Sequence, residues 1–281
     1  MDKRSLFHRV TVSTLNRLAR TPRVASAAFA MVGFHEHWSG NASDELRFLA
    51  FCGSMRHLSH GQILQDLWVL YELDLQPQGY YVEFGAYDGT AHSNSKLLEE
   101  RFGWTGLLVE PNPDMADALR SGRSSTVDAR CVWDRTGETV ELLVTGDAEL
   151  STVADHATSD IHTGARHATA VRTVSVPTVS LNDLLDEHDA PEIIDFMSVD
   201  TEGTELRILK AFDFSKRPPR LVAVEHNRRN DERDLDGLMF SAGYERRFRA
   251  MSDWDAWYRL RAAETNQPPS QQLSFSERPG T

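Results

Sequence analysis

The stretch Tyr81-Val-Glu-Phe-Gly-Ala-Tyr-Asp-Gly89 decides the fold of this chain. The residues at 79–85 are rich in aromatic and apolar side chains and end at a glycine, which is typical of a short buried strand before a tight turn. We expect a helix next, at 93–102, and a second strand at 106–110. A strand, a helix and a second strand in this order form a crossover unit, which indicates a parallel sheet.

Short apolar runs continue to alternate with amphipathic segments as far as about residue 260. We expect further strands at 126–133, 139–144, 193–200, 220–225, 244–248 and 256–260. We expect further helices from Pro113 through Leu119 and at 181–187, 204–211 and 233–242. The pattern predicts an α/β fold in which helices cover both faces of a mostly parallel sheet.

The composition is that of a globular protein with one large domain and extensions: 281 residues, 40% hydrophobic and 26% charged. The formal net charge of −12 argues against a nucleic acid as the main partner, because phosphate binding depends largely on Lys and Arg. Two cysteines, Cys52 and Cys131, are too few for a disulfide framework or a cysteine-rich zinc site. The sequence therefore favours a reducing, cytoplasmic setting.

The two ends of the chain differ from its middle. We expect a helical N-terminal extension with a basic head at 1–57, the main domain at 58–262 and a disordered polar tail at 263–281. The extension is expected to pack on the domain or on a partner subunit, as in a homo-oligomer. Peripheral contact with an anionic membrane surface and a cleaved targeting segment are the alternatives. No apolar run approaches the roughly 20 residues that are needed to span a bilayer.

The loop after the first strand suits a phosphate-free nucleoside better than a dinucleotide. Gly85 and Gly89 let a ligand approach the main chain, but the spacing is not G-x-G-x-x-G and no third glycine opens the helix. A pyrophosphate would need that third glycine. Glu110 ends the second strand about 20 residues further on, where a carboxylate can accept both ribose hydroxyls. A plain turn and a strand-terminal surface glutamate are the alternatives.

Several segments together make the chain similar to class I methyltransferases and, in detail, to the FkbM family. They are 81–89, Ser93-Asn-Ser95, 102–112, 195–209 with its Asp200-Thr-Glu-Gly-Thr-Glu205 signature, Val224-Glu-His-Asn227 and Gln65-Asp66. The resemblance covers roughly residues 58–260. It implies a seven-stranded, Rossmann-like sheet whose last strands form an antiparallel hairpin. It also implies O-methyl transfer from S-adenosyl-L-methionine, often to a sugar in a natural product, polysaccharide or glycolipid.

By the same resemblance, the glycine loop and Glu110 are expected to hold the cofactor. The residues expected to bind it are Glu83, Gly85, Ala86, Asp88, Gly89, Asn94, Glu110, Pro111, Asn112 and Asp128.

Methyl transfer is an in-line displacement, so the protein must align the acceptor oxygen and remove its proton. The candidates for this catalytic role lie at the ends of the strands expected at 193–200 and 220–225: Asp200, Glu202, Glu225 and His226. The alternative role for Glu202 is to cap the following helix, and the alternative for His226 is to act as a buried structural hydrogen-bond donor. A competing interpretation is a metal site, because Asp200, Glu225 and Asn227 offer oxygen ligands suited to Mg²⁺.

One position departs from the family. In Trp254-Asp-Ala-Trp-Tyr258, Ala256 stands where family members often have a second consecutive acid. This departure favours one alternative, a cofactor-binding module without turnover, while the missing third glycine disfavours another, a nicotinamide-dependent oxidoreductase. The aromatic residues of the run either stack on a sugar or belong to the core. The residues at 147–170, rich in Ser, Thr, Ala and His, are expected to form an acceptor lid or a plain insertion.

Overall fold

The computed structural model describes residues 43–145, 152–153, 170–227 and 232–262. Its main sheet has seven strands in the order β10-β11-β9-β8-β1-β2-β3. Their bounds are β1 (Tyr80–Phe84), β2 (Thr105–Val109), β3 (Thr126–Asp128), β8 (Phe196–Val199), β9 (Leu221–Glu225), β10 (Tyr244–Arg247) and β11 (Asp255–Leu260). The five strands β1, β2, β3, β8 and β9 run parallel to one another, while β11 is antiparallel to both β9 and β10. The predicted α/β fold with a mainly parallel sheet is confirmed.

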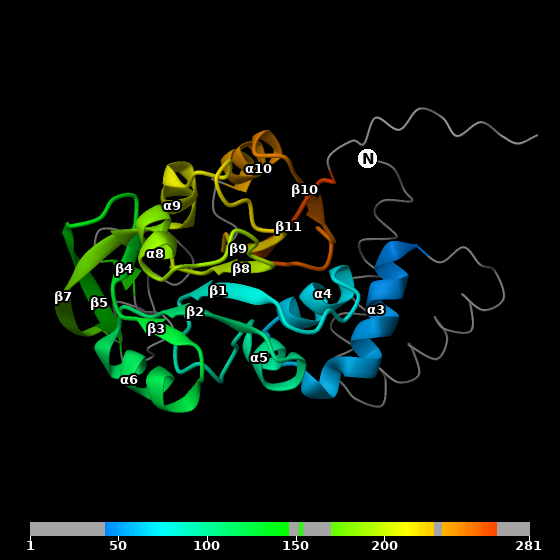
Figure 1. Cartoon of the computed structure of the whole chain (residues 1–281), viewed down its shortest axis with the longest axis horizontal. Coiled ribbons are helices and arrows are strands. Elements are labelled where there is room, and N and C mark those ends of the chain that lie inside the picture. Colours follow the sequence, from blue (N-terminus) through cyan, green and yellow to red (C-terminus); the bar gives the residue numbers. More distant parts are fainter. Residues whose placement is uncertain (1–42, 146–151, 154–169, 228–231, 263–281) are drawn as a thin grey trace, which may run out of the picture.

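Helices cover both faces of the main sheet (Figure 1). On one face lie α4 (Gln65–Glu72), α5 (Lys96–Phe102) and α6 (Pro113–Gly122), and on the other lie α8 (Leu181–Glu187), α9 (Glu205–Ala211) and α10 (Glu232–Ser241). Each face has its own apolar core. Trp68 of α4 meets Phe196 of β8 edge-on in the first core, whereas Met197 of the same strand packs with Ile208 and Met239 in the second. Successive side chains of a strand point to opposite faces, so β8 contributes to both cores.

A second, smaller sheet stands beside the main one (Figure 1). Its order is β4-β7-β5-β6, with β4 (Cys131–Trp133), β5 (Thr139–Thr145), β6 (Thr152–Val153) and β7 (Ala170–Ser180). The single strand expected at 126–133 is therefore wrong, because β3 belongs to the main sheet and β4 to the second. The Asp128 carboxylate accepts the backbone N–H of Arg130 at 2.8 Å, and this local turn separates the two strands. β7 has no counterpart among the predicted strands.

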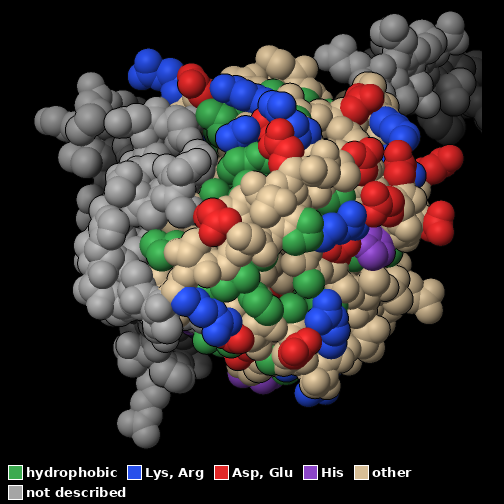
Figure 2. All heavy atoms as spheres, turned by 90° about the vertical axis from the view of Figure 1, so that its left-hand side faces the viewer, with side chains coloured by type: hydrophobic (Ala, Val, Ile, Leu, Met, Phe, Trp, Pro, Cys, Tyr) green, Lys and Arg blue, Asp and Glu red, His purple; other side chains and the backbone are tan. Residues whose placement is uncertain are grey.

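Figure 2 shows the side of the molecule on which the second sheet lies, and positive and negative side chains are interspersed over it. Arg172 of β7 pairs with Asp114 of α6 at 2.7 Å. Arg207 of α9 pairs with Asp134, the residue after β4, at 2.9 Å, and its guanidinium lies over the Trp133 ring. These contacts connect the second sheet to helices on both faces of the main sheet.

The helix α3 (Asp44–Met55) packs on the first face and is part of its core. Phe48 is fully buried, stacks on Phe248 with ring centroids 4.6 Å apart, and meets Trp257 edge-on. The basic head of the extension expected at 1–57 lies outside the described residues, as does the tail at 263–281, and the division of the chain at residue 57 stays a prediction. In the part of the chain that the structure describes, no helix is long and apolar enough to cross a membrane.

Candidate active site

A cavity of about 620 Å³ lies where the two sheets meet. The ends of β1, β2, β8 and β9 contribute one part of its wall, and β4, β5 and β6 contribute another. Ligands of open parallel sheets bind at the carboxyl ends of the strands, and small-molecule pockets usually have volumes of about 300–1,000 Å³. This cavity is therefore the candidate active site.

The turn after β1 needs glycine at its first position. Gly85 has a φ of 71°, and a Cβ atom there would lie 2.0 Å from the carbonyl oxygen of Asp200. Only glycine combines that backbone angle with so close an approach. The backbone N–H groups of Gly85 and Ala86 both donate to the Val109 carbonyl, at 3.0 and 3.3 Å. The turn thus holds the ends of β1, β2 and β8 together at the cavity.

Glu110 follows β2, is buried and lines the cavity. Its Oε2 accepts the backbone N–H of Tyr87 and its Oε1 accepts that of Asn112, both at 2.9 Å. A carboxylate has about four acceptor positions, so about two remain for a ligand. Burial raises the pKa of Glu110 to about 7, because the charged form is poorly solvated. Hydrogen bonds donated by a ligand would favour the ionised form.

Glu83 and Asn94 line the cavity beside the glycine turn. The Glu83 carboxylate accepts the backbone N–H of Asn94 at 2.7 Å and the hydroxyls of Ser93 and Ser95. The Asn94 amide donates to Ser198 Oγ at 2.9 Å, while its Oδ1 has no hydrogen-bond partner among the described residues. Asn94 is only 8% exposed, so Oδ1 is a buried acceptor that a donor of a ligand can satisfy.

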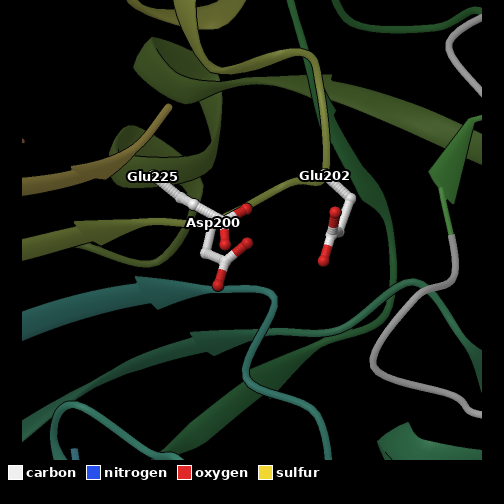
Figure 3. Close-up of side chains that lie close together, drawn as sticks. All are labelled: Asp200, Glu202 and Glu225. Atoms are coloured by element: carbon white, nitrogen blue, oxygen red, sulfur yellow. The ribbon is translucent and has the colours of Figure 1, made fainter. Parts of the chain in front are cut away.

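Three carboxylates gather at the ends of β8 and β9 (Figure 3). Asp200, Glu202 and Glu225 each place an oxygen within 4.8 Å of the others. Asp200 and Glu225 lie side by side, and Glu202 approaches from the turn before α9. Burial raises the pKa of Asp200 to about 7, and burial together with the charge of Asp200 raises the pKa of Glu225. Adjacent carboxyl groups of this kind share a proton near neutral pH.

The two residues after Glu225 differ in their placement. Asn227 donates its amide N–H to Glu225 Oε2 at 2.7 Å. The group of possible metal ligands in the structure therefore contains Glu202 in place of the predicted Asn227. His226 is 4% exposed and is not part of the cavity wall. Its Nε2 lies 3.0 Å from the carbonyl oxygen of Asp255. The structure therefore brings Glu202 to Asp200 and Glu225 but directs His226 away from them.

The predicted cofactor residues divide into two groups. Those that line the cavity are Glu83, Gly85, Ala86, Asn94, Glu110 and Pro111. Asp88, Gly89, Asn112 and Asp128 do not line it. Asp88 accepts the backbone N–H of Thr90, Asn112 caps α6 through the N–H of Asp114, and Asp128 pairs with Arg130. In the described structure these polar side chains shape the turns that carry the wall residues.

The second sheet supplies wall residues that the sequence did not predict: Cys131, Val132, Leu142, Thr152 and Val153. Thr152 Oγ1 donates to the carbonyl oxygen of Glu202 at 2.8 Å, which ties β6 to the turn that carries this acid. β6 falls inside the stretch at 147–170 expected as a lid or an insertion, and the residues at 147–151 and 154–169 lie outside the described residues. A strand of two residues has no periodicity, so no local signal marked it.

The aromatic run near the hairpin belongs mostly to the core. Trp254 lines the cavity, but Trp257 stacks on Trp68 with ring centroids 5.2 Å apart, and Tyr258 is fully buried. Ala256 is fully buried too, in the apolar core of the second face. An acid at this position would face that core, so the departure at Ala256 leaves the cavity wall unchanged.

The open sheet, with a cavity at the carboxyl ends of its parallel strands, has the architecture of an α/β protein that binds a small-molecule ligand. Residues 83–254 match the sequence model of the family described as the methyltransferase FkbM domain. This match spans more than half of the chain, which therefore belongs to the FkbM methyltransferase family.

Two solved structures are similar at low identity. One, a SAM-dependent methyltransferase from Aquifex aeolicus, has 11% identity and a TM-score of 0.33, with 74% of this chain and 97% of that chain covered. The other, a mutant of MtNAS, has 10% identity and a TM-score of 0.31, with 89% of this chain and 98% of that chain covered. Among curated proteins, none matches the chain.

Proposed function

We propose that this chain transfers the methyl group of S-adenosyl-L-methionine to a hydroxyl oxygen of a sugar in a glycolipid, a polysaccharide or a natural product. The observation that carries the proposal is the carboxylate pair of Asp200 and Glu225 at the cavity. A sugar hydroxyl is a weak acid, so its methylation needs a base close to the reacting oxygen.

The order of strands separates the two halves of the reaction. Glu225 ends β9 and Glu110 follows β2, which is three strands away and hence about 14 Å at the usual strand spacing. Glu110 and the Gly85 turn would hold the ribose, and Glu83 with Asn94 would face the methionine end. When bound, S-adenosyl-L-methionine supplies an electrophilic methyl carbon, so no protein nucleophile is required.

Asp200 and Glu225 then act on the acceptor. The pKa of Asp200 is raised to about 7, which lies in the range in which a general base is most effective, and the charge of Asp200 helps to raise the pKa of Glu225. Trp254 is the neighbouring wall residue, because its carbonyl accepts the backbone N–H groups of His226 and Asn227 at 2.9 and 3.1 Å. Its indole offers a flat apolar surface on which a sugar ring can rest.

Asp200→Asn tests the assignment of the base. We expect the substitution to leave binding of S-adenosylhomocysteine within about twofold of the wild type and to lower the transfer rate by about 10²–10⁴-fold, the usual contribution of a general base. Methyl transfer from labelled cofactor is measured at saturating cofactor. Asp117→Asn, on the exposed face of α6, is the control. Full activity of Asp200→Asn would remove this residue from the mechanism.

The acceptor class needs its own experiment. Labelled cofactor is incubated with a panel of free glycosides, glycolipids and polysaccharides, and the new O-methyl group is located by NMR. Thermal stabilisation by S-adenosylhomocysteine without transfer to any acceptor would support a binding module, and stabilisation by NAD instead would support an oxidoreductase. The feature that favoured a binding module, Ala256, lies in the core and not at the cavity.

A divalent cation is the second candidate for activating the hydroxyl. Asp200, Glu202 and Glu225 offer hard oxygen atoms of the kind that Mg²⁺ binds, so the donor set fits the ion. Bound there, it would lower the pKa of a coordinated hydroxyl. Loss of transfer with EDTA and recovery with Mg²⁺ would support the ion, whereas transfer unaffected by EDTA would leave the proton-sharing pair as the base.

A further inference from the structure

A buried polar network lies behind Glu83 and has no part in the mechanism above. Its centre is Arg123, the residue after α6, whose side chain is 1% exposed and does not line the cavity. The guanidinium pairs with Glu99 Oε2 at 2.8 Å and donates to the Tyr81 hydroxyl at 2.9 Å. It also donates to the carbonyl oxygen of Gly89 at 3.0 Å, which fixes it to the glycine turn.

The same guanidinium reaches Glu83 through two serine hydroxyls. Arg123 Nη1 donates to Ser93 Oγ at 3.1 Å, and Nη2 donates to Ser95 Oγ at 2.9 Å. A hydroxyl oxygen that accepts from the guanidinium directs its single hydrogen elsewhere, and both hydroxyls donate to Glu83 Oε2. Two parallel chains of hydrogen bonds therefore connect one buried cation to one cavity carboxylate.

We propose that Arg123 is a positioning residue for cofactor binding, which holds the Glu83 carboxylate through Ser93 and Ser95 toward the cationic methionine end of S-adenosyl-L-methionine. The proposal rests on the proposed function, because it takes the cavity as the cofactor site. Three described donors reach the Glu83 carboxylate, so about one of its four acceptor positions remains for a ligand. The unpartnered Asn94 Oδ1 lines the same part of the cavity. Two such acceptors suit an ammonium group, which only donates.

The network also opposes the protonation of Glu83. Burial raises the pKa of Glu83, while the charge of Arg123 and the hydrogen bonds from the serines and Asn94 oppose the rise. The other titratable groups near it are Tyr81 on β1, Glu99 on α5 and Asp200 after β8. Burial disfavours ionised Glu99 as well, but hydrogen bonds from Tyr81 and Arg123 outweigh it and hold the pKa of Glu99 at about 2. Arg123 is thus the charge that balances the two glutamates.

Binding of S-adenosylhomocysteine, which has the same methionine end, tests the proposal by calorimetry near pH 6 and near pH 8.5. Ser95→Ala removes one chain of hydrogen bonds and leaves the pair of Arg123 and Glu99 in place. We expect about tenfold weaker binding than the wild type near pH 6 and a smaller loss near pH 8.5. The reason is that Glu83, with one donor fewer, becomes protonated at a higher pH. Arg123→Gln should show a larger loss with the same pH dependence.

The control is Arg120→Gln, three residues before Arg123, which removes only a surface pair with Asp117 and should bind like the wild type at both pH values. Comparison with the wild type at each pH cancels the titration of Glu110, which all variants share. In a Glu83→Gln background, Ser95→Ala should lose its pH dependence, because no carboxyl remains at position 83 to titrate. The melting temperature of each ligand-free variant reports whether it folds.

Equal losses at the two pH values, or a pH-dependent loss that persists with Glu83→Gln, would overturn the positioning role and show a merely structural one. These outcomes leave the proposed function intact, because the wild type still binds. If the folded wild type does not bind S-adenosylhomocysteine, the proposed function fails and this inference fails with it.

Discussion

Glu110 accepts two backbone N–H groups, yet burial holds its pKa at about 7, well above the 4.5 of an ordinary glutamate. This carboxyl therefore titrates near neutral pH in the free protein. Ribose hydroxyls that donate to the carboxyl would favour its ionised form. Cofactor binding is then coupled to the release of a proton, and the affinity depends on pH.

We predict that S-adenosylhomocysteine binds about tenfold more weakly near pH 6 than near pH 8, because Glu110 must first lose its proton below its pKa of about 7. The sign follows from the ligand donors: the affinity is complete above the pKa of the free protein and falls as the pH drops below it. Calorimetry in buffers of different ionisation enthalpy counts the proton. Glu110→Gln should bind weakly at both pH values, and an unchanged pH dependence in this variant would exclude Glu110 as the ribose acceptor.

At the same scale, the sequence identified acids at strand ends but not the direction of every side chain. Adjacent residues of an extended chain point to opposite sides, so with Glu225 at the cavity His226 is directed toward the Asp255 carbonyl. Asp88 and Asn112 bind neighbouring backbone N–H groups, as short polar side chains often do in turns. Arg123 gave no signal, because only the fold brings it to Glu83.

Among the elements, helices and parallel strands with strong local patterns were predicted closely. α8 occupies the predicted residues 181–187, and β9 begins one residue after the predicted 220. The second sheet was not predicted, because its pairing joins distant segments: β5 pairs with β7 from Thr139↔Pro177 to Thr145↔Ala170. The β7 sequence is rich in β-branched residues, but Pro177 is unfavourable in a central strand. In the structure it lies opposite Thr139, the first residue of β5.

The close approach of the turn after β1 to the residue after β8 yields a prediction about the sheet itself. Gly85→Ala should destabilise the protein by more than the about 1–2 kcal/mol of a left-handed backbone, because the new Cβ would lie 2.0 Å from the Asp200 carbonyl oxygen. Gly103→Ala is the matched control, since Gly103 has a φ of 68° and an added Cβ would meet nothing within 4 Å. Urea unfolding compares the two. Equal losses would mean that the residues around Gly85 and Asp200 move apart at no cost, and that the close approach does not require glycine.

For the whole molecule, the main question is which residues fold as one unit. α3 precedes the boundary predicted at residue 57, yet its side chains fill the core between α4 and the hairpin. Phe48 contacts Phe248 and Trp257 from the far end of the chain. Asp44 accepts the Tyr71 hydroxyl at 2.6 Å and pairs with Arg247. Through these apolar and ionic contacts, α3 connects α4 to the C-terminal hairpin of β10 and β11.

We therefore predict that a chain beginning at residue 58 is much less stable than one beginning at residue 43. Removal of α3 exposes the apolar surface around Phe248 and Trp257, and the loss of Phe48 alone should cost about 3–5 kcal/mol of the free energy of unfolding. Phe48→Ala in the full chain measures the contribution of Phe48 alone and avoids any effect of the new N-terminus that truncation creates. The stability of both truncated chains and of the Phe48→Ala variant is measured by urea unfolding followed by circular dichroism.

If the chain from residue 58 unfolds at the same urea concentration as the chain from residue 43, α3 is an appendage and the predicted division at residue 57 is a true domain boundary. If it unfolds much earlier, the catalytic domain begins with α3, because the core that supports β8 and the hairpin is incomplete without it.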